Sequence, residues 1–371
     1  MNALYDIIGI PFGYLMKLIN YFFQNYAVSI IVFTIVTKIL MFPINYKTQK
    51  SAARMQLLTP KLEKLRKSFA NNPQRLQQEQ QKLYIQEGIN PMGSCLPAFI
   101  QMFLLFGVLD VVYKPITHIL RISKDIRRAA AEIAGTGIGD LRCELRVMSH
   151  LNTHYDEYNN LGSNFAERVS DFSNNFTVFG ANLGKTPSLH PDTWNRESIV
   201  LFMIPILAGL AQLLSSVYSQ IHQKKVNPNM QGGGCMTFLM YFMPLMSVWF
   251  AFNVPAGVGF YWIWSALLSF VMSFLLNQYF TPERTEAINE KEKERARIYA
   301  KKHPEKKTFM QRMMEQQEML DKQNDAMRRG ASGDEKASRS EINKYNRDKI
   351  KEARKRMAEK YGEIYDENDD D

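Results

Sequence analysis

Asn25-YAVSIIVFTIVTKILMFPI-Asn45 is an apolar stretch long enough to cross a lipid bilayer as a single helix. Roughly 20 helical residues span a hydrocarbon core of about 30 Å. Lys38 lies a little past the middle, and a lysine at such depth costs about 2.5–3.5 kcal/mol on insertion scales. A membrane helix keeps such a side chain where it faces water or a partner. The stretch therefore predicts a transmembrane helix and makes Lys38 the first candidate functional residue.

Four further apolar stretches follow, and together they predict an all-α polytopic membrane protein. A three-residue turn at Pro255-Ala256-Gly257 predicts that the last two form a tight hairpin. Residues 1–24 alternate apolar and polar faces, which is typical of an amphipathic helix lying at the interface. The five expected transmembrane helices cover residues 25–45, 93–115, 198–220, 237–255 and 258–280.

The charges of the connecting segments predict the orientation. Lysine and arginine accumulate in segments 46–92 and 221–236, which lie on one side of the membrane if the helices alternate. Cytoplasmic loops carry the excess of these residues, so we expect the N-terminus outside and the C-terminus inside. Residues 116–197 then form an extracytoplasmic loop or cap, and residues 281–371 form a charged cytoplasmic tail.

The cytoplasmic segment 46–92 has apolar residues near helical spacing, interrupted at Asn71-Asn72-Pro73. This pattern predicts a helical hairpin, in which Pro60 bends or restarts the first helix. The alternative is a charged connector that only enforces topology. The mixed charges of the tail suit either contact with ribosomal RNA or anionic lipid, or a simply solvated segment.

Polar residues form a stripe on several of the expected membrane helices. The stripe of Lys38 could meet the others in a shared interior, or each stripe could merely hydrogen-bond neighbouring helices. Lys38 favours the first interpretation: no acidic residue lies in the third to fifth helices, so its ammonium needs a water-filled cavity open to the cytoplasm. The candidate groove residues are Lys38, Thr34, Asn45, Gln101, Gln212, Ser215, Ser216, Ser219, Trp262, Ser265 and Ser269, with Ser273 nearly in line.

Four motifs resemble the signatures of the YidC family of membrane protein insertases, and they occur in the family's order. They are Thr37-KILMFPI, Gly88-INPMGSCLPAFIQM, Asn175-FTVFGANLGKTP and Pro255-AGVGFYW, which are spread over most of residues 20–280. The family usually carries arginine at the position of Lys38, so this chain keeps the charge but loses the planar donor fork. The stretch 118–165 and the tail lie outside the signatures.

The resemblance implies five transmembrane helices around a hydrophilic groove that is open to cytoplasm and lipid. It implies a chaperone of the bacterial plasma membrane that binds nascent membrane proteins, alone or beside the Sec translocon. In such a protein the cytoplasmic hairpin captures the passenger, the groove charge attracts acidic tails, and the passenger leaves along the third and fifth helices. A ribosome contact through the tail and the cytoplasmic loops is a further expectation.

Two other function classes stay open at the level of sequence. A small-solute transporter or channel would use Lys38 as an anion site, although the unequal spacing of the helices shows no inverted repeat. An enzyme is disfavoured because no nucleophile–base or paired-carboxylate arrangement lies within the expected helices. His150 and His154 near Asp156 offer a weak metal site without an evident third ligand. We therefore expect a non-enzymatic protein without cofactors.

Overall fold

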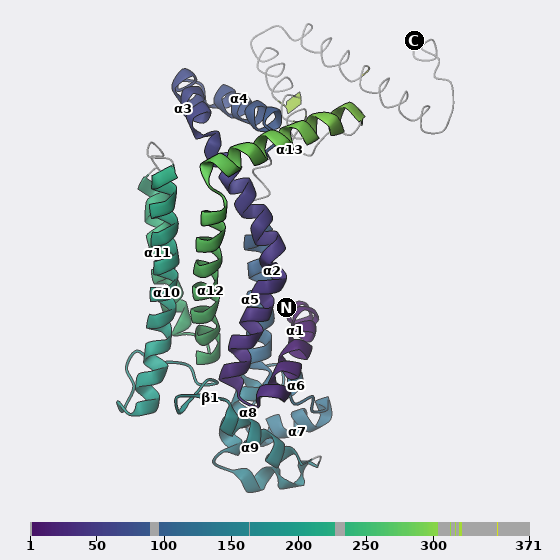
Figure 1. The fold of residues 1–371 in the computed structure, drawn as a ribbon. Helices are drawn as coiled ribbons and strands as arrows, with labels where there is room; N and C mark the ends of the chain where they lie inside the picture. Colours follow the sequence, from purple (N-terminus) through teal and green to yellow (C-terminus); the bar gives the residue numbers. More distant parts are fainter. Residues whose placement is uncertain are drawn as a thin grey trace, which may run out of the picture. The chain divides into compact units, whose positions relative to one another are not determined.

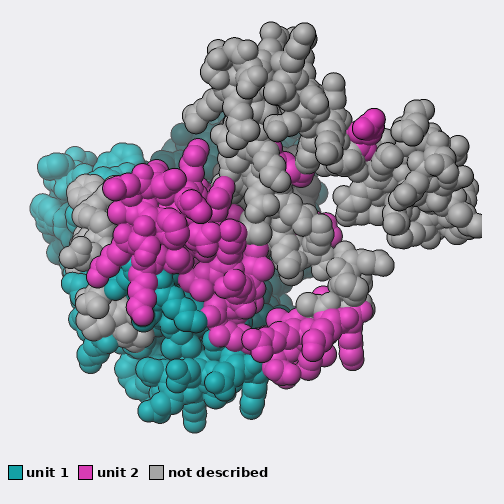
Figure 2. Space-filling view, turned by 90° about the horizontal axis from the view of Figure 1, so that it is seen from above, with its two compact units in different colours: residues 1–63, 91–291 teal, residues 64–90, 292–371 magenta. Residues whose placement is uncertain are grey.

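The structure, a computed structural model, describes residues 2–89, 96–162, 164–226 and 234–302 and a few single positions beyond them. The chain divides into two compact units, residues 1–63 with 91–291 and residues 64–90 with 292–371, which Figure 2 shows in teal and magenta. Residues 227–233 of the predicted loop 221–236, the start of the predicted helix 93–115 and most of the predicted tail 281–371 lie outside the described residues. The described ends of that predicted loop are helical, so the flanking helices are longer than the sequence predicts.

Long helices dominate the first unit, as the sequence predicts (Figure 1). Three described helices are long and apolar enough to cross a membrane: Tyr26–Leu57, Arg196–Lys225 and Ala256–Tyr279. Phe99–Tyr113 and Phe242–Ala251 are shorter apolar helices, so the full set of five crossings stays a prediction. The long elements are α1 (Asn2–Phe23), α2 (Tyr26–Leu57), α5 (Leu96–Tyr113), α10 (Arg196–Val226), α11 (Gly234–Ala251) and α12 (Ala256–Tyr279).

Helix α2 begins as its sequence predicts but ends later. The Asn25 side-chain oxygen accepts a hydrogen bond from the Val28 N–H, which caps the first turn. Pro43 lies inside the helix, and the backbone remains helical to Leu57. The predicted boundary at residue 45 is therefore not a helix end, because the following residues are good helix formers such as lysine, glutamine and alanine.

The long helices of the first unit pack side by side, most of them against two or more others. Helix α12 packs against both α2 and α10, and α10 also packs against α11. Helix α1 packs against α5 and α2, burying Met16 and Ile19 while Tyr21 and Phe22 stay exposed.

Two glycines permit close approach between elements of this unit. A Cβ at Gly13 would lie 2.5 Å from the His118 Nδ1 atom, and a Cβ at Gly209 would overlap the Val248 Cγ2 atom.

Short elements fill the segment between α5 and α10. They pack on a shared core that includes Tyr158, Phe165, Val169 and Phe176, with the buried Tyr26 ring 4.2 Å from that of Phe176. The elements are α6 (Pro115–His118), α7 (Lys124–Ile133), α8 (Cys143–Leu151), the 3-10 helix η2 (Tyr155–Leu161), α9 (Phe165–Asn175), β1 (Thr177–Val178) and β2 (Ala181–Asn182). The antiparallel pair β1–β2, in which Thr177 pairs with Asn182, is a small departure from the all-α expectation.

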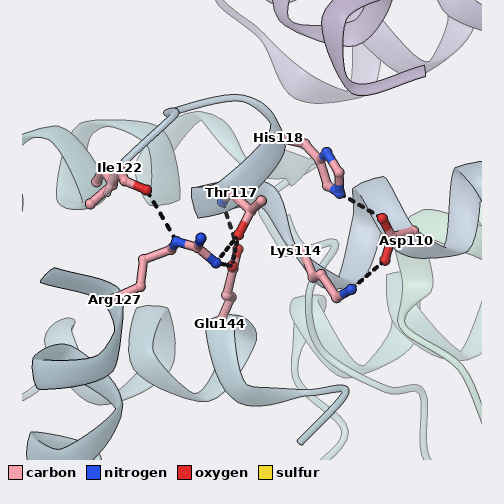
Figure 3. A network of polar contacts seen from close by, with 7 residues as sticks. All are labelled: Asp110, Lys114, Thr117, His118, Ile122, Arg127 and Glu144. Atoms are coloured by element: carbon pink, nitrogen blue, oxygen red, sulfur yellow. Dashed lines mark hydrogen bonds and ion pairs between the residues drawn. The ribbon is translucent and has the colours of Figure 1, made fainter. Parts of the chain in front are cut away.

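A buried polar network joins α6, α7 and α8 to one another and to α5 (Figure 3). Asp110 of α5 pairs with Lys114 at 2.7 Å and with the His118 Nε2 atom at 2.6 Å. Glu144 of α8 accepts hydrogen bonds from the Thr117 N–H at 2.9 Å and from the Thr117 hydroxyl, and it lies 3.3 Å from Arg127 of α7. Burial raises the pKa of the Glu144 carboxyl above its ordinary value.

The second unit contains α4 (Pro73–Gln86), together with parts of α3 (Thr59–Ser68) and α13 (Pro282–Lys302). Asn72 caps α4 by accepting from the Arg75 N–H at 3.0 Å, so the predicted break at Asn71-Asn72-Pro73 separates two helices. Glu87, which follows α4, is buried and forms an ion pair with Lys293 of α13.

Candidate functional site

A polar cavity of about 320 Å³ lies among α2, α5 and α12. Four of the predicted groove residues line it: Lys38, Asn45, Gln101 and Ser269. Residues from three helices far apart in the sequence therefore meet at one place. The remaining lining residues are Met41, Thr48, Gln49, Met272, Ser273 and Leu276.

Among the residues that the structure describes, Lys38 is the only cation that lines this cavity, and it is 8% exposed. Its ammonium nitrogen donates a hydrogen bond to the Ser269 hydroxyl oxygen at 2.7 Å. The Ser269 hydroxyl in turn donates to the Ser265 carbonyl at 2.6 Å. Among the described residues no carboxylate pairs with Lys38, so hydration from the cavity is the available compensation for its buried charge.

Amide side chains join the helices around this cavity. The Asn45 side chain donates to the Met272 sulfur at 3.2 Å. Gln49 donates to the Asn277 side-chain oxygen, and Asn277 donates to the Tyr218 hydroxyl at 3.5 Å. This chain of side chains links α2, α12 and α10. Sequence analysis missed Thr48 and Gln49, although they follow Asn45 at i+3 and i+4, the spacing that places residues on one helix face.

The predicted residues on α10 do not line the cavity. The Ser215 hydroxyl donates to the carbonyls of Ala211 and Ala266, each at 3.2 Å, which joins α10 to α12. Ser219 accepts from Gln223 at 3.2 Å, Gln212 is exposed and Ser216 is half-buried. The contact of Ser215 has the form that polar residues take when they join membrane helices.

Three other predicted residues support the cavity without lining it. Thr34 is fully buried, and its hydroxyl donates to the Ile30 carbonyl one turn earlier at 2.6 Å. Ser265 is buried and provides the carbonyl that accepts from Ser269. The half-buried Trp262 packs its ring against that of Phe250 of α11 at 5.7 Å.

The histidine pair lies in the segment between α5 and α10. The rings of His150 and His154 stack at 4.2 Å, and the His150 Nδ1 atom lies 2.9 Å from the Tyr158 hydroxyl. Within the described ranges, no group of three histidine, cysteine, aspartate or glutamate residues is placed to hold a metal ion. The contacts of the pair are those of a packed aromatic cluster.

The cavity lies within the part of the chain that matches a known family. The model of the family described as 60Kd inner membrane protein matches residues 18–284. The chain belongs to this family. The match includes α2, α5 and α12, and therefore every residue that lines the cavity. Family membership and the apolar helices together make the chain a multi-pass membrane protein.

Curated relatives confirm the resemblance to the YidC family. The chain is 26% identical over 258 residues to "Membrane protein insertase YidC" of Chlorobium limicola, covering 70% of this chain and 34% of the relative. It is 25% identical over 288 residues to the protein of the same name from Chloroherpeton thalassium, a match that covers 78% of this chain and 39% of the relative. It is also 25% identical over 272 residues to the protein of that name from Granulibacter bethesdensis, a match that covers 72% of this chain and 37% of the relative. The matches thus cover 34% to 39% of the length of these relatives.

Proposed function

We propose that this chain is a membrane protein insertase that binds nascent membrane proteins in the cavity beside Lys38. It helps short polar tails to cross the membrane and releases transmembrane helices into lipid, alone or with the Sec translocon. The observation that carries the proposal is a buried lysine without a carboxylate partner in the described chain, facing a polar cavity between membrane helices. The names of the relatives favour the same activity and give no support to a small-solute transporter.

The physical basis of the proposed activity is that the cavity shortens the apolar layer which a polar segment has to cross. A polar segment that crosses the bilayer loses the hydrogen bonds that its backbone made with water. A hydrated cavity between the helices offers such a segment polar partners such as Gln101 and Asn45 for part of the path. The Lys38 charge adds attraction for acidic tails, which is stronger between the helices than in bulk water. The sequence contains no complete phosphate-binding loop of the form Gly-x-x-x-x-Gly-Lys-Ser/Thr, because Phe179 stands where Gly184-Lys185-Thr186 would need the first glycine. Partitioning of the passenger's own apolar helix therefore drives the process.

The proposal includes the topology expected from the sequence. The shorter apolar helices α5 and α11 join α2, α10 and α12 as five crossings, with the N-terminus outside the plasma membrane of a bacterium and the C-terminus in the cytoplasm. The segment 46–92 captures the passenger, and the third and fifth crossings, α10 and α12, release it. Contacts with the ribosome through the tail and cytoplasmic loops belong to the same proposal, as does action without covalent chemistry.

The experiment compares variants of Lys38 in proteoliposomes that contain the purified full chain. Two single-spanning passengers differ only in the charge of the translocated tail, which is acidic in one and neutral in the other. We expect Lys38→Ala to lower translocation of the acidic tail about tenfold, equivalent to about 1.4 kcal/mol of lost attraction. Lys38→Arg retains translocation because it retains the charge.

The matched control is Lys47→Ala, which removes an exposed lysine of the same helix that does not line the cavity. We expect it to behave as the unmodified chain does. Equal translocation of both tails by Lys38→Ala, at equal amounts of reconstituted protein, would exclude Lys38 from the mechanism. Solute flux through liposomes without any passenger would instead favour a channel.

A further inference from the structure

A second polar cavity, of about 240 Å³, lies in the first unit where α8, the loop after β2 and the start of α12 meet. Neither the family signatures nor the proposed function assigns it a role. Its cationic residues are Arg142 and Arg146 beside and on α8, and Lys185 in the loop. The other lining residues are Leu145, Met148, Ser149, Asn152, Asn182, Gly184, Thr186 and Pro255.

The lining is basic, since the described residues that form it include three cations and no carboxylate. Arg146 pairs with Asp140 at 2.8 Å and Lys185 pairs with Glu197 at 2.8 Å, but neither acid lines the cavity. Arg142 donates through its Nη2 atom to the Asn253 carbonyl at 2.9 Å and has no carboxylate ion pair within the described chain. The two acids therefore leave about one positive charge uncompensated, and Ser149 and Asn152 add neutral polar groups. Such a lining suits an anion.

The cavity is placed at the end of a membrane helix. Pro255, which lines it, is the residue directly before α12, and Ala256–Tyr279 is long and apolar enough to cross a membrane. The loop is fastened to the first turn of that helix, because the Ala256 N–H donates to the Lys185 carbonyl at 2.9 Å and the Gly257 N–H to the Leu183 carbonyl at 2.8 Å. Lys185 is thus held where the hydrocarbon layer ends, at the depth of the lipid headgroups.

Aromatic residues near the cavity in sequence support this depth. Phe179, in the turn between β1 and β2, is 75% exposed, and Trp194, shortly before α10, is 59% exposed. Tryptophan rings such as that of Trp194 are enriched at the boundary between hydrocarbon and water. A basic cavity at this depth meets the phosphates of lipids before it meets any soluble anion.

We propose that this cavity binds the phosphate-bearing headgroup of an anionic phospholipid. The guanidinium groups of Arg142 and Arg146 contact the phosphate oxygens, because their fork of N–H donors matches a tetrahedral anion. Lys185 adds a point charge from the loop. The volume of about 240 Å³ accommodates a phosphate with a small polar substituent such as glycerol. The site does not depend on the insertase activity, so binding alone can test it.

The experiment titrates the purified full chain in detergent with dihexanoylphosphatidylglycerol and measures binding by calorimetry. Dihexanoylphosphatidylcholine, which carries no net charge, tests whether the anionic headgroup matters. Inorganic phosphate tests whether a free anion suffices. We expect saturable binding of the glycerol lipid that Arg142→Gln weakens about tenfold, because the variant loses a hydrogen bond between two charged groups.

Two further variants separate binding from folding. Arg142 also holds the Asn253 carbonyl, so its loss can disturb the turn between α11 and α12. Arg146, whose side chain is 57% exposed, is the second variant: Arg146→Gln weakens lipid binding while thermal unfolding stays unchanged. Arg128→Gln, an exposed arginine of α7 outside the cavity, retains full binding as the matched control.

Three results would overturn the proposal. The first is binding of the glycerol lipid that does not saturate. The second is equal affinity in the unmodified chain and in both Arg142→Gln and Arg146→Gln. The third is inorganic phosphate that binds as tightly as the lipid and competes with it, which would make the cavity a site for free phosphate.

Discussion

The Lys38 ammonium nitrogen lies 2.7 Å from the Ser269 hydroxyl oxygen, and this hydrogen bond joins α2 to α12. The hydroxyl hydrogen of Ser269 is directed to the Ser265 carbonyl at 2.6 Å. A hydroxyl has one hydrogen and two lone pairs, so a lone pair of Ser269 is left to face the ammonium. The α12 backbone therefore fixes where the charge of Lys38 is held in the cavity.

The first prediction concerns Ser269 as a positioning residue for Lys38. Ser269→Ala removes the acceptor but leaves the charge, so we expect a loss in translocation of acidic tails of about threefold, smaller than that of Lys38→Ala. Ser273→Ala is the control, because Ser273 lines the cavity and no hydrogen bond joins it to Lys38. The same proteoliposome assay measures both variants. A loss in Ser269→Ala as large as in Lys38→Ala would show that position matters as much as charge.

The second prediction concerns water in the cavity. In a chain whose native cysteines are replaced by serine, Asn45→Cys reacts with a charged, membrane-impermeant thiol reagent, because residue 45 lines the cavity. Leu210→Cys is the control: Leu210 is 55% exposed on α10, an apolar surface that lies in lipid when the helix crosses the membrane. We expect fast labelling of the first and slow labelling of the second. Equal rates in intact membrane vesicles would contradict a hydrated cavity.

The third prediction concerns the contact between α1 and the residues after α5. A Cβ added at Gly13 would lie 2.5 Å from the His118 Nδ1 atom and 2.9 Å from its Cβ atom, so α1 or the buried histidine must move. We expect Gly13→Ala to destabilise the protein by about 1–3 kcal/mol, the usual cost of overpacking. Gly137→Ala is the matched control, because nothing lies within 4 Å of its added Cβ. Thermal unfolding in detergent compares the two, and similar midpoints would contradict close packing of α1.

The fourth prediction concerns the pH dependence of stability through Glu144. Burial raises the pKa of its carboxyl above the ordinary 4.5, so the folded state holds the proton more tightly than the unfolded state. This contribution to stability is present at acidic pH and is lost as pH rises through the interval between the two pKa values. Glu144→Gln cannot titrate, so its stability relative to the unmodified chain increases from acidic to neutral pH.

The measurement for Glu144 is the unfolding midpoint of both proteins across that pH range. Glu132→Gln, which alters an exposed carboxylate on α7, serves as the control and should follow the unmodified chain. Parallel pH profiles for Glu144→Gln and the unmodified chain would show that Thr117 and Arg127 compensate the buried charge fully.

Helix periodicity brought together some residues that the structure places around one cavity, while their role in binding a passenger stays a prediction. Lys38 and Asn45 were placed on one face of their helix by their spacing, and both line the cavity. The same reasoning grouped Gln212, Ser215, Ser216 and Ser219, which lie on α10 away from it. Spacing within one helix establishes which residues share a face, but it does not establish which neighbour that face meets. Thr48 and Gln49 were missed because the helix was expected to end at residue 45.

The sequence by itself determined the long apolar helices and the isolated charge of Lys38, because hydrophobic length and the cost of a buried ammonium are properties of a segment alone. It also determined the family, through motifs that each lie within one short stretch. Only the tertiary structure decided that Ser269 accepts from Lys38, that Ser215 joins two helices and that Arg142, Arg146 and Lys185 surround one cavity. Those relationships depend on how helices far apart in the chain pack together, which no local pattern encodes.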